Sequence, residues 1–225
     1  GIHLEIHKKM PFGSGLGSSA ASAAAGVMAI NELLKRPLSK RELLPFAVLG
    51  EQIAEGAYLE DYVAPSLMGG MVLIRDNKSL DVHRVPIPSG IYATVVYPHI
   101  KILTKDARSV LSEQVSLQQS IQQNGNLGSL ILGLIRSDLD LISRSLKEVI
   151  IEPQRAQLIP GFYEVQEKAL ENGALGCSIS GAGPSIFALC ANSHKAEYVG
   201  MAMQEVFNIR KLVCELYISQ INHEG

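Results

Sequence analysis

The hydrophobic and polar positions along the chain follow two periods, one typical of strands and one typical of helices. Residues 2–7, IHLEIH, alternate apolar and polar side chains, which predicts a half-buried strand. Residues 177–190 predict two strands around a glycine turn. Further strands are expected from β-branched or alternating runs at 68–75, 80–88, 91–103 and 211–218. The first two of these runs predict a hairpin connected by Asn77 and Lys78.

Apolar residues spaced three and four apart, together with helix-forming residues, predict helices over much of the remaining chain. The first helix begins at Ser18 or Ser19, both of which are N-cap candidates. The polar string QQNGN at 122–126 predicts a break inside a longer helical region, and Gly173 predicts the end of another helix. The expected helical regions are 18–34, 40–63, 104–157, 162–173 and 196–207.

These elements follow one another in mixed order, without a strict strand–helix–strand alternation. That order predicts the α+β class. A length of 225 residues corresponds to one large domain or two small lobes. The sequence has no fixed-period repeat and no low-complexity linker.

Composition and charge narrow the classes of protein. The chain is 47% hydrophobic and 19% charged, with a net charge of −2, so it has no basic excess to bind nucleic acid. Its apolar runs are too short to predict a membrane span, and no signal peptide is found. Cys177, Cys190 and Cys214 lack the spacing of zinc ligands and predict reduced, buried thiols in a cytoplasmic protein. Because the sequence starts at Gly1, we expect that upstream sequence is missing.

The block PFGSGLGSSAASAAAG, residues 11–26, is the strongest candidate for chemistry. Gly13, Gly15 and Gly17 allow positive φ angles and leave the backbone amides accessible. The helix that follows offers unpaired N–H groups and a dipole that favours an anion, so the block can hold phosphate. A P-loop lysine and a matching dinucleotide-binding motif are both absent from the sequence. Taken alone, the block fits equally well a glycine-rich turn before a buried helix.

The longer string PFGSGLGSSAA resembles the ATP-phosphate loop of the GHMP kinases, a family that includes galactokinase, homoserine kinase and mevalonate kinase. A second block, GALGCSISGAGPSIFAL at 173–189, is similar to the C-terminal glycine motif of that family. The resemblance implies an ATP-dependent kinase. The implied ATP-binding residues are Pro11, Phe12, Gly13, Ser14, Gly15, Leu16, Gly17, Ser18, Ser19, Ala20 and Ala21.

The resemblance also implies the fold. We expect a two-lobe GHMP kinase whose N-terminal lobe, residues 1–85, is like domain 2 of ribosomal protein S5 and is truncated at its start. Residues 86–225 are expected to form a ferredoxin-like C-terminal lobe.

Within the family, the chain most resembles the homoserine kinases. The similar segments are VAPSLMGGMVLI, TKDAR and IEPQRAQLIPGF, at 63–74, 104–108 and 151–162. The implied reaction is ATP-dependent phosphorylation of L-homoserine to O-phospho-L-homoserine, a step toward threonine.

The resemblance assigns individual site residues. Ser19 and Glu51 match a serine and a glutamate that hold Mg²⁺, and both are hard oxygen ligands. Arg108 and Arg155 match a clamp for the substrate carboxylate. Asp61 matches the acid that faces the substrate ammonium group. With Ser19 and Glu51 it completes the expected catalytic group, and none of the three is assigned as a general base. The remaining expected substrate contacts are Thr104 and Gly181.

The sequence departs from the homoserine kinases at one part of the substrate site. Where they usually read SGSxHADNVAP, residues 55–65 read EGAYLEDYVAP, so a histidine is replaced by Leu59 and an asparagine by Tyr62. Leucine cannot hydrogen-bond, and tyrosine is bulkier than asparagine. The site is therefore rearranged, weakened or adapted to another substrate. Two alternatives stay open: a GHMP kinase for another small alcohol, and a nucleotide-binding homologue with little turnover. The sequence leaves the oligomeric state open, with a homodimer as the candidate assembly.

Overall fold

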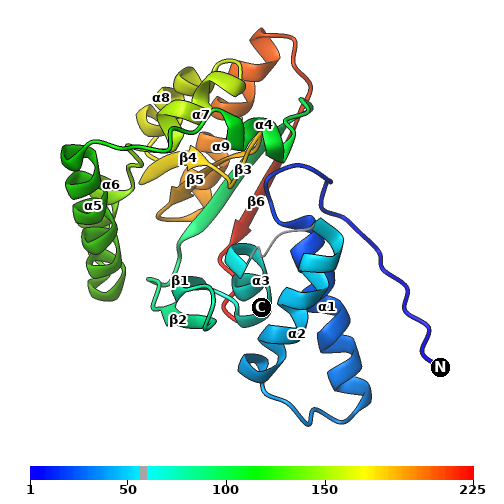
Figure 1. Cartoon of the computed structure of the whole chain (residues 1–225). Helices are drawn as coiled ribbons and strands as arrows, with labels where there is room; N and C mark the ends of the chain where they lie inside the picture. The colour runs from blue at the N-terminus through cyan, green and yellow to red at the C-terminus, as the bar shows by residue number, and fades with distance from the viewer. Residues whose placement is uncertain (56–59) are drawn as a thin grey trace. The chain divides into compact units, whose positions relative to one another are not determined.

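The computed structural model describes residues 1–55 and 60–225, and the side chains of residues 54, 55, 60 and 104 lie outside the description. The described chain divides into two compact units (Figure 1). Unit 1 consists of Gly1–Phe12, Leu16–Pro86 and Asn222–Gly225, and unit 2 consists of Gly13–Gly15 and Ile87–Ile221. The units differ from the expected division at 85/86 because residues 13–15 belong to unit 2, and Pro86 and residues 222–225 belong to unit 1.

The described residues of unit 1 pack three helices and a β-hairpin around one small core. Its elements are α1 (Ser18–Leu33), α2 (Lys40–Glu55), α3 (Glu60–Met68), β1 (Met71–Asp76) and β2 (Asp81–Val85). Ala20 and Ala24 are buried in α1, where their small side chains allow close packing against the neighbouring helices. The larger members of this core are Leu43, Leu44, Val48, Val63, Leu67 and Val82.

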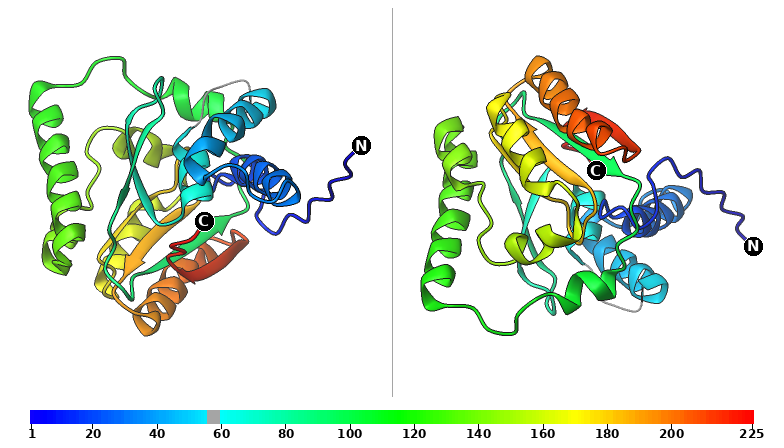
Figure 2. Two further views of the ribbon diagram at one scale, coloured as in Figure 1. Left: turned by 90° about the horizontal axis from the view of Figure 1, so that it is seen from below. Right: turned by 90° about the horizontal axis from the view of Figure 1, so that it is seen from above.

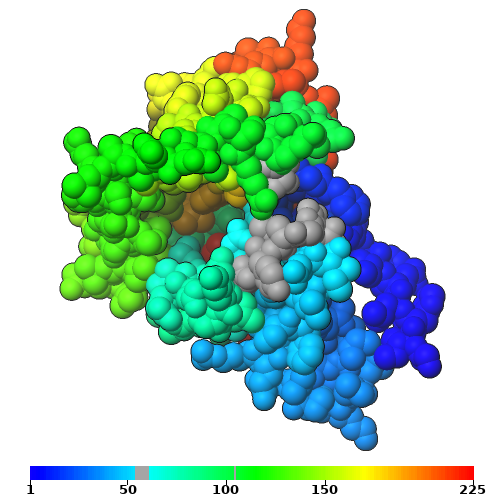
Figure 3. Space-filling view, viewed as in Figure 1, coloured from blue at the N-terminus to red at the C-terminus, as the bar shows by residue number. Residues whose placement is uncertain are grey.

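Three expectations for unit 1 are corrected. Residues 2–7 form no strand: no described strand pairs with this exposed segment (dark blue in Figure 3), so its alternating pattern has no sheet to join. The expected helix 40–63 is helical in its described parts, α2 up to Glu55 and α3 from Glu60, and it continues past residue 63 to Met68, while residues 56–59 lie outside the described residues. The β1–β2 hairpin is confirmed, but Asp76 pairs with Asp81, so its loop has four residues rather than two.

Unit 2 is built on an antiparallel sheet in the order β4-β5-β3-β6. Its strands are β3 (Tyr92–Pro98), β4 (Gly176–Ile179), β5 (Ile186–Cys190) and β6 (Cys214–Gln220). With α8 (Phe162–Glu171) before β4 and α9 (Ser193–Ile209) before β6, this order is the ferredoxin-like topology, as expected. Figure 2 shows α8, in yellow-green, and α9, in orange, against the sheet. The largest buried side chains of this core are Phe162, Phe207, Ile186 and Met203.

The chain between β3 and α8 is helical, as expected, but its breaks differ from the prediction. Its elements are α4 (Thr104–Ser109), α5 (Leu117–Arg136), α6 (Leu139–Ser145), α7 (Glu152–Arg155) and a 3₁₀ turn, Ala156–Leu158. The expected break at 122–126 is wrong because α5 runs through it. The polar side chains there bond outside their own helix: Gln123 accepts from the Val149 amide at 3.0 Å, and Asn126 donates to the Lys147 carbonyl at 2.9 Å.

Candidate active site

The glycine loop has the backbone conformation that the sequence predicts. Gly13, Gly15 and Gly17 have φ angles of 62°, 78° and 75°, a region that favours glycine over residues with a Cβ. A Cβ on Gly13 would meet no atom within 4 Å. A Cβ on Gly15 would lie 2.4 Å from the Ser180 carbonyl oxygen. Close packing against the protein therefore requires glycine at position 15, whereas position 13 is open.

Within unit 2, the loop and the downstream glycine motif are hydrogen-bonded to each other. The Ser185 amide donates to the Ser14 carbonyl at 3.1 Å, and the Ser180 hydroxyl donates to the Gly15 carbonyl at 2.8 Å. Ser14 and Ser185 are both buried. Two glycine-rich segments far apart in the sequence thus form one structural element.

Within unit 1, the loop leads into an N-terminus of α1 that can accept an anion. Its N-cap is Gly17, which supplies no side-chain oxygen to the first-turn amides, and the first turn of α1 carries no acidic residue. The Lys8 ammonium lies 3.3 Å from the Ser18 carbonyl oxygen and 4.3 Å from the centre of the Phe12 ring. A cation beside a helix N-terminus adds to its attraction for phosphate. Sequence reasoning missed Lys8, because nothing in its local pattern links it to the loop.

Ser19 and Glu51, expected to hold a metal, come together in unit 1. The Ser19 hydroxyl donates to Oε1 of Glu51 at 2.5 Å, which joins the first turn of α1 to α2. Glu51 is only 2% exposed, and its Oε2 is buried with no hydrogen-bond partner among the described residues. A buried carboxylate oxygen left without a partner is costly in free energy. It is the kind of ligand that Mg²⁺ binds, so the pair fits a divalent cation.

The position of Tyr62 gives this departure from the usual sequence a structural role. Its ring packs on Gly17 so closely that a Cβ on Gly17 would lie 2.6 Å from Cδ1 of the tyrosine. Tyr62 therefore supports the N-cap residue of α1. Leu59, the other departure, lies outside the described residues.

Arg155, expected to contact the substrate, is held in place by two backbone carbonyls of unit 2. Its Nε donates to Ala107 of α4 at 3.2 Å, and its Nη1 donates to Gly181 of the glycine motif at 2.8 Å. These bonds use two of the five N–H groups of the guanidinium, so others are left for a ligand. The structure thus brings together Arg155, Gly181 and the residue that precedes Arg108.

The other expected substrate residues lie in α4 and α3. Arg108 follows Ala107 in α4 and is exposed. Thr104 begins α4, and its side chain lies outside the description. Asp61 is an exposed residue of α3 in unit 1.

Glu152 anchors α7 and was not singled out by the sequence. Its carboxylate accepts hydrogen bonds from Gln166 at 2.9 Å and from the Ser178 hydroxyl, which tie α7 to α8 and β4. Burial raises the pKa of Glu152, although these two hydrogen bonds oppose the shift. Because Arg155 lies three residues further along the same short helix, Glu152 helps to fix where Arg155 stands. The EPQR string at 152–155 contains both residues, but the resemblance assigned a role only to the arginine.

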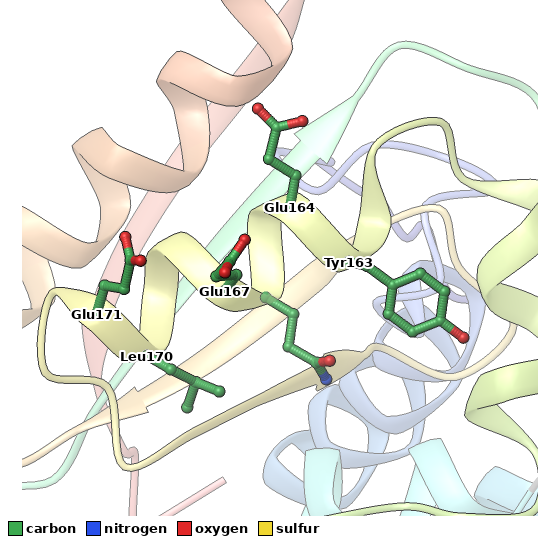
Figure 4. A pocket seen from close by; sticks show the side chains of 6 residues that line it. Tyr163, Glu164, Glu167, Leu170 and Glu171 are labelled. Atoms are coloured by element: carbon green, nitrogen blue, oxygen red, sulfur yellow. The ribbon is translucent and has the colours of Figure 1, made fainter.

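A cavity of about 710 Å³ lies on the outer side of α8, and Gln166, which donates to Glu152, is part of its lining. Figure 4 shows its lining of acidic and apolar side chains, among them Glu164, Glu171 and Leu170. Glu164 is ion-paired with Arg210, and Glu171 with Lys168. None of the expected site residues lines this cavity.

Over residues 1–55 and 60–225, no three His, Cys, Asp or Glu side chains cluster as metal ligands. No helix among these residues has the length and apolar character needed to cross a bilayer.

Family models and relatives agree on the kind of protein. The model for the GHMP kinases N terminal domain matches residues 1–70, and that for the GHMP kinases C terminal domain matches residues 130–209. The homoserine kinase of Chlorobium phaeobacteroides (strain BS1) is 50% identical over 226 residues, which cover 100% of this chain and 71% of the relative. The homoserine kinase of Chlorobaculum tepidum is 46% identical and is covered to 70%.

Solved structures agree with these relatives. The crystal structure of homoserine kinase from Cytophaga hutchinsonii matches with a TM-score of 0.94 and 50% identity, covering 97% of this chain and 69% of that one. Mevalonate kinase from L. major shares the fold at 19% identity, with a TM-score of 0.72, covering 92% of this chain and 67% of that one. With both glycine motifs and the Ser19–Glu51 pair in place, the chain belongs to the GHMP kinase family and, within it, to the homoserine kinases.

Proposed function

We propose that this chain transfers the γ-phosphoryl group of ATP to the hydroxyl of L-homoserine, giving O-phospho-L-homoserine and ADP. The relatives named homoserine kinase, at 46–50% identity over the whole chain, support the substrate. The observation that carries the chemistry is the buried Ser19–Glu51 pair, in which one carboxylate oxygen has no described partner.

In this proposal Ser19 and Glu51 hold Mg²⁺ at the start of α1. A bound Mg²⁺ neutralises charge on the phosphates and orients them. The orphaned Oε2 of Glu51 supports this role because a ligand there would remove the free-energy cost of burying an unpaired oxygen.

The ATP phosphates lie on the glycine loop. Gly13 offers open space beside its backbone, and the amides at the start of α1 point where an anion gains from the helix dipole. Lys8 adds a positive charge within reach of Ser18. Each of these groups can position a triphosphate without taking part in a covalent step.

The amino-acid end of homoserine is recognised by charge in this proposal. The substrate is a zwitterion, so a guanidinium suits its carboxylate and a carboxylate suits its ammonium group. We assign Arg155 and Arg108 to the first task and Asp61 to the second. Thr104 and the backbone of Gly181 are assigned as neighbouring contacts. The two carbonyls that hold Arg155 support its role because they fix its direction before the substrate arrives.

No residue is assigned as a general base. Transfer forms a bond between the homoserine oxygen and the γ-phosphorus and breaks the bond from that phosphorus to the bridging oxygen. The hydroxyl proton is released. Phosphoryl transfer depends mainly on alignment and charge neutralisation, which the loop amides, Lys8 and the Ser19–Glu51 pair supply.

The proposal is tested by measuring ADP release with a panel of acceptors: L-homoserine, mevalonate, galactose and no acceptor. We expect homoserine to give the highest kcat/KM by a wide margin. A preference for another alcohol would favour a different GHMP kinase activity. ATP binding without release of ADP on any acceptor would favour a nucleotide-binding homologue.

Two further parts of the proposal follow from this chemistry. The partner is a small molecule rather than a nucleic acid, in line with a net charge of −2. The free thiols of Cys177, Cys190 and Cys214 suit a reducing compartment, so we assign the enzyme to the cytoplasm.

A further inference from the structure

Helix α7 has only four residues, yet its side chains bond to several separate segments of unit 2. Arg155 donates to the Ala107 carbonyl of α4, and Figure 1 shows the two helices close together. A second residue of α7, Gln154, reaches the loop that follows α4. Its Oε1 accepts a hydrogen bond from the Ser112 amide at 2.6 Å. The resemblance assigned no role to Gln154.

The start of α7 is fixed by two carboxylates, one half-buried and one buried. Glu148 accepts from the amides of Ile150 at 3.0 Å, of Ile151 at 2.6 Å and of Glu152. These bonds satisfy amides that a helix leaves free at its N-terminus. Glu152 in turn accepts from Gln166 of α8 at 2.9 Å. Helix α7 is thus anchored to the core of unit 2 by bonds that involve no ligand.

The side chain of Gln154 is oriented at both ends of its amide. Its Nε2 donates to the Ile150 carbonyl at 2.5 Å, one turn back in the chain, and its Oε1 accepts from Ser112. A carbonyl needs a donor and a backbone amide needs an acceptor, so one orientation of the side-chain amide satisfies both partners. The oxygen of Gln154 is therefore held toward Ser112 by the anchored helix.

The stretch from residue 107 to residue 112, which we call the α4 end, is attached to α7 at both of its limits. Arg155 binds the Ala107 carbonyl at 3.2 Å, and Gln154 binds the Ser112 amide at 2.6 Å. Arg108 lies between these two attachment points. Two consecutive residues of α7 thus set the backbone on either side of Arg108.

Helix α4 gains little stability from its own sequence. It has six residues, which is far below the length at which an isolated helix is stable in water. Its N-cap, Leu103, has no side-chain oxygen to bond to the first-turn amides. Of its described side chains only Ala107 is buried. The position of the α4 end therefore depends on the bonds from α7.

We propose that Gln154 is a positioning residue: by holding Ser112, it fixes the α4 end so that Arg108 is directed at the carboxylate of the substrate. This inference rests on the proposed function, in which Arg108 binds that carboxylate. Gln154 itself does not contact the substrate. Because Ser112 is exposed, its amide can bond to water when Gln154 is replaced. The loss therefore affects the position of Arg108 more than the folding of unit 2.

The first test is Gln154→Met, which keeps the length of the side chain and removes its polar atoms. We expect the KM for homoserine to rise about three- to tenfold, which is the effect of losing one hydrogen bond. The KM for ATP and the midpoint of thermal unfolding should change little. Gln157→Met is the matched control, because Gln157 is exposed and its side chain donates to the Gln154 carbonyl, at 2.7 Å, within the same helical stretch.

Two results of this test would overturn the inference. One is a KM for homoserine that Gln154→Met leaves unchanged. The other is a rise in both KM values together with a lower midpoint of unfolding, which would mean that Gln154 only supports the fold.

The second test is a double-mutant cycle with Arg108→Leu. If Gln154 acts through Arg108, Gln154→Met should raise the KM for homoserine no further once Arg108 is replaced. Equal effects of Gln154→Met in both backgrounds would contradict the inference.

The cycle also separates this inference from the proposed function. An unchanged kcat/KM for homoserine in Arg108→Leu would remove Arg108 from the proposed substrate site, and the inference with it. A clear loss in Arg108→Leu without any effect of Gln154→Met would overturn the positioning role alone and leave the proposed function intact.

The third test needs no substrate. Hydrogen exchange of the Ser112 amide, followed by NMR in the intact protein, reports whether Gln154 protects it. We expect exchange at least about fivefold faster in Gln154→Met than in the wild type or in Gln157→Met. Equal exchange rates would mean that the α4 end is held without Gln154, and would overturn the inference whichever substrate the enzyme uses.

Discussion

The hydroxyl of Ser180 donates to the carbonyl of Gly15 at 2.8 Å, across 165 residues of sequence. A Cβ on Gly15 would lie 2.4 Å from the carbonyl oxygen of the same serine. The phosphate loop is thus locked against the second glycine motif at a distance that only glycine permits. The missing side chain at Gly15 permits close internal packing. The missing side chain at Gly13 leaves open space beside the backbone.

Gly15→Ala is therefore expected to destabilise the fold more than Gly13→Ala does. Both carry a positive φ, which costs roughly 1–2 kcal/mol for alanine. Gly15→Ala adds a clash with backbone oxygens, worth about 1–3 kcal/mol more. Urea unfolding measures the difference between the two variants. Equal stabilities would mean that the contact with Ser180 does not constrain position 15.

Gly13→Ala, in turn, is the variant that tests ATP binding, because its methyl group enters open space beside the loop. We expect weaker ATP binding in calorimetry, with a loss of stability limited to the cost of the positive φ at position 13. Gly26→Ala is the control, since a Cβ there also meets nothing within 4 Å and Gly26 lies within α1, outside the loop. Unchanged ATP affinity in Gly13→Ala would contradict the placement of the ATP phosphates beside Gly13.

Glu51→Gln should separate stability from catalysis. Removing the buried charge should leave the ligand-free protein at least as stable as the wild type, because Oε2 has no described partner to lose. A neutral amide is a poorer Mg²⁺ ligand, so the Mg²⁺ concentration for half-maximal rate should rise and kcat should fall. Thermal unfolding and a Mg²⁺ titration measure the two effects. Glu32→Gln is the control, because Glu32 is an exposed residue of α1, and it should give the wild-type curve in the Mg²⁺ titration.

Arg155→Leu should lower kcat/KM for homoserine at least about tenfold, since hydrogen bonds to a charged group contribute about 1.5–3 kcal/mol. The KM for ATP should stay near that of the wild type. Arg144→Leu, at an exposed position of α6, controls for loss of a positive charge. An amino alcohol without the carboxylate should react about equally poorly with Arg155→Leu and wild type. If Arg155→Leu weakens ATP and spares homoserine, the arginine serves the nucleotide instead.

Tyr62 should act through the loop that its ring supports. Tyr62→Phe keeps the ring against Gly17, whereas Tyr62→Ala removes it. We expect Tyr62→Ala to weaken ATP binding and Tyr62→Phe to stay close to the wild type. If the double variant Leu59→His with Tyr62→Asn turns over homoserine faster than the wild type, these two departures from the usual sequence limit the rate of the wild-type chain.

The pH dependence of stability should carry a contribution from Glu152. Burial raises its pKa above the ordinary 4.5, so the native state binds this proton more tightly than the unfolded state does. The contribution is fully present below pH 4.5 and is lost as the pH rises through the raised pKa. Urea unfolding at a series of pH values should show this decline in the wild type and a smaller one in Glu152→Gln. Glu167→Gln, exposed on α8, should keep the wild-type slope.

Local patterns in the sequence determined the elements and the nature of the loop. The spacing of apolar residues predicted most helices and strands, and the glycines of residues 11–17 predicted the positive φ angles that the structure has. Backbone conformation and helix starts depend on neighbouring residues, which is why they could be predicted. The roles of Ser19 and Glu51 came from resemblance, and the structure brings the two within 2.5 Å. The roles of Arg108, Arg155, Asp61, Thr104 and Gly181 stay predictions.

Contacts between distant residues were decided only by the tertiary structure. Residues 2–7 have a strand pattern, yet a strand needs a partner and none is described beside them. The string 122–126 reads as a break but stays helical because Gln123 and Asn126 bond to residues 147–149. Lys8 acquires its role from the start of α1, Tyr62 from Gly17, and Glu152 from Ser178 in β4. The local sequence around these three residues does not specify those contacts. Hydrogen bonds and packing across long separations fix these positions, and a linear pattern does not encode which distant groups will meet.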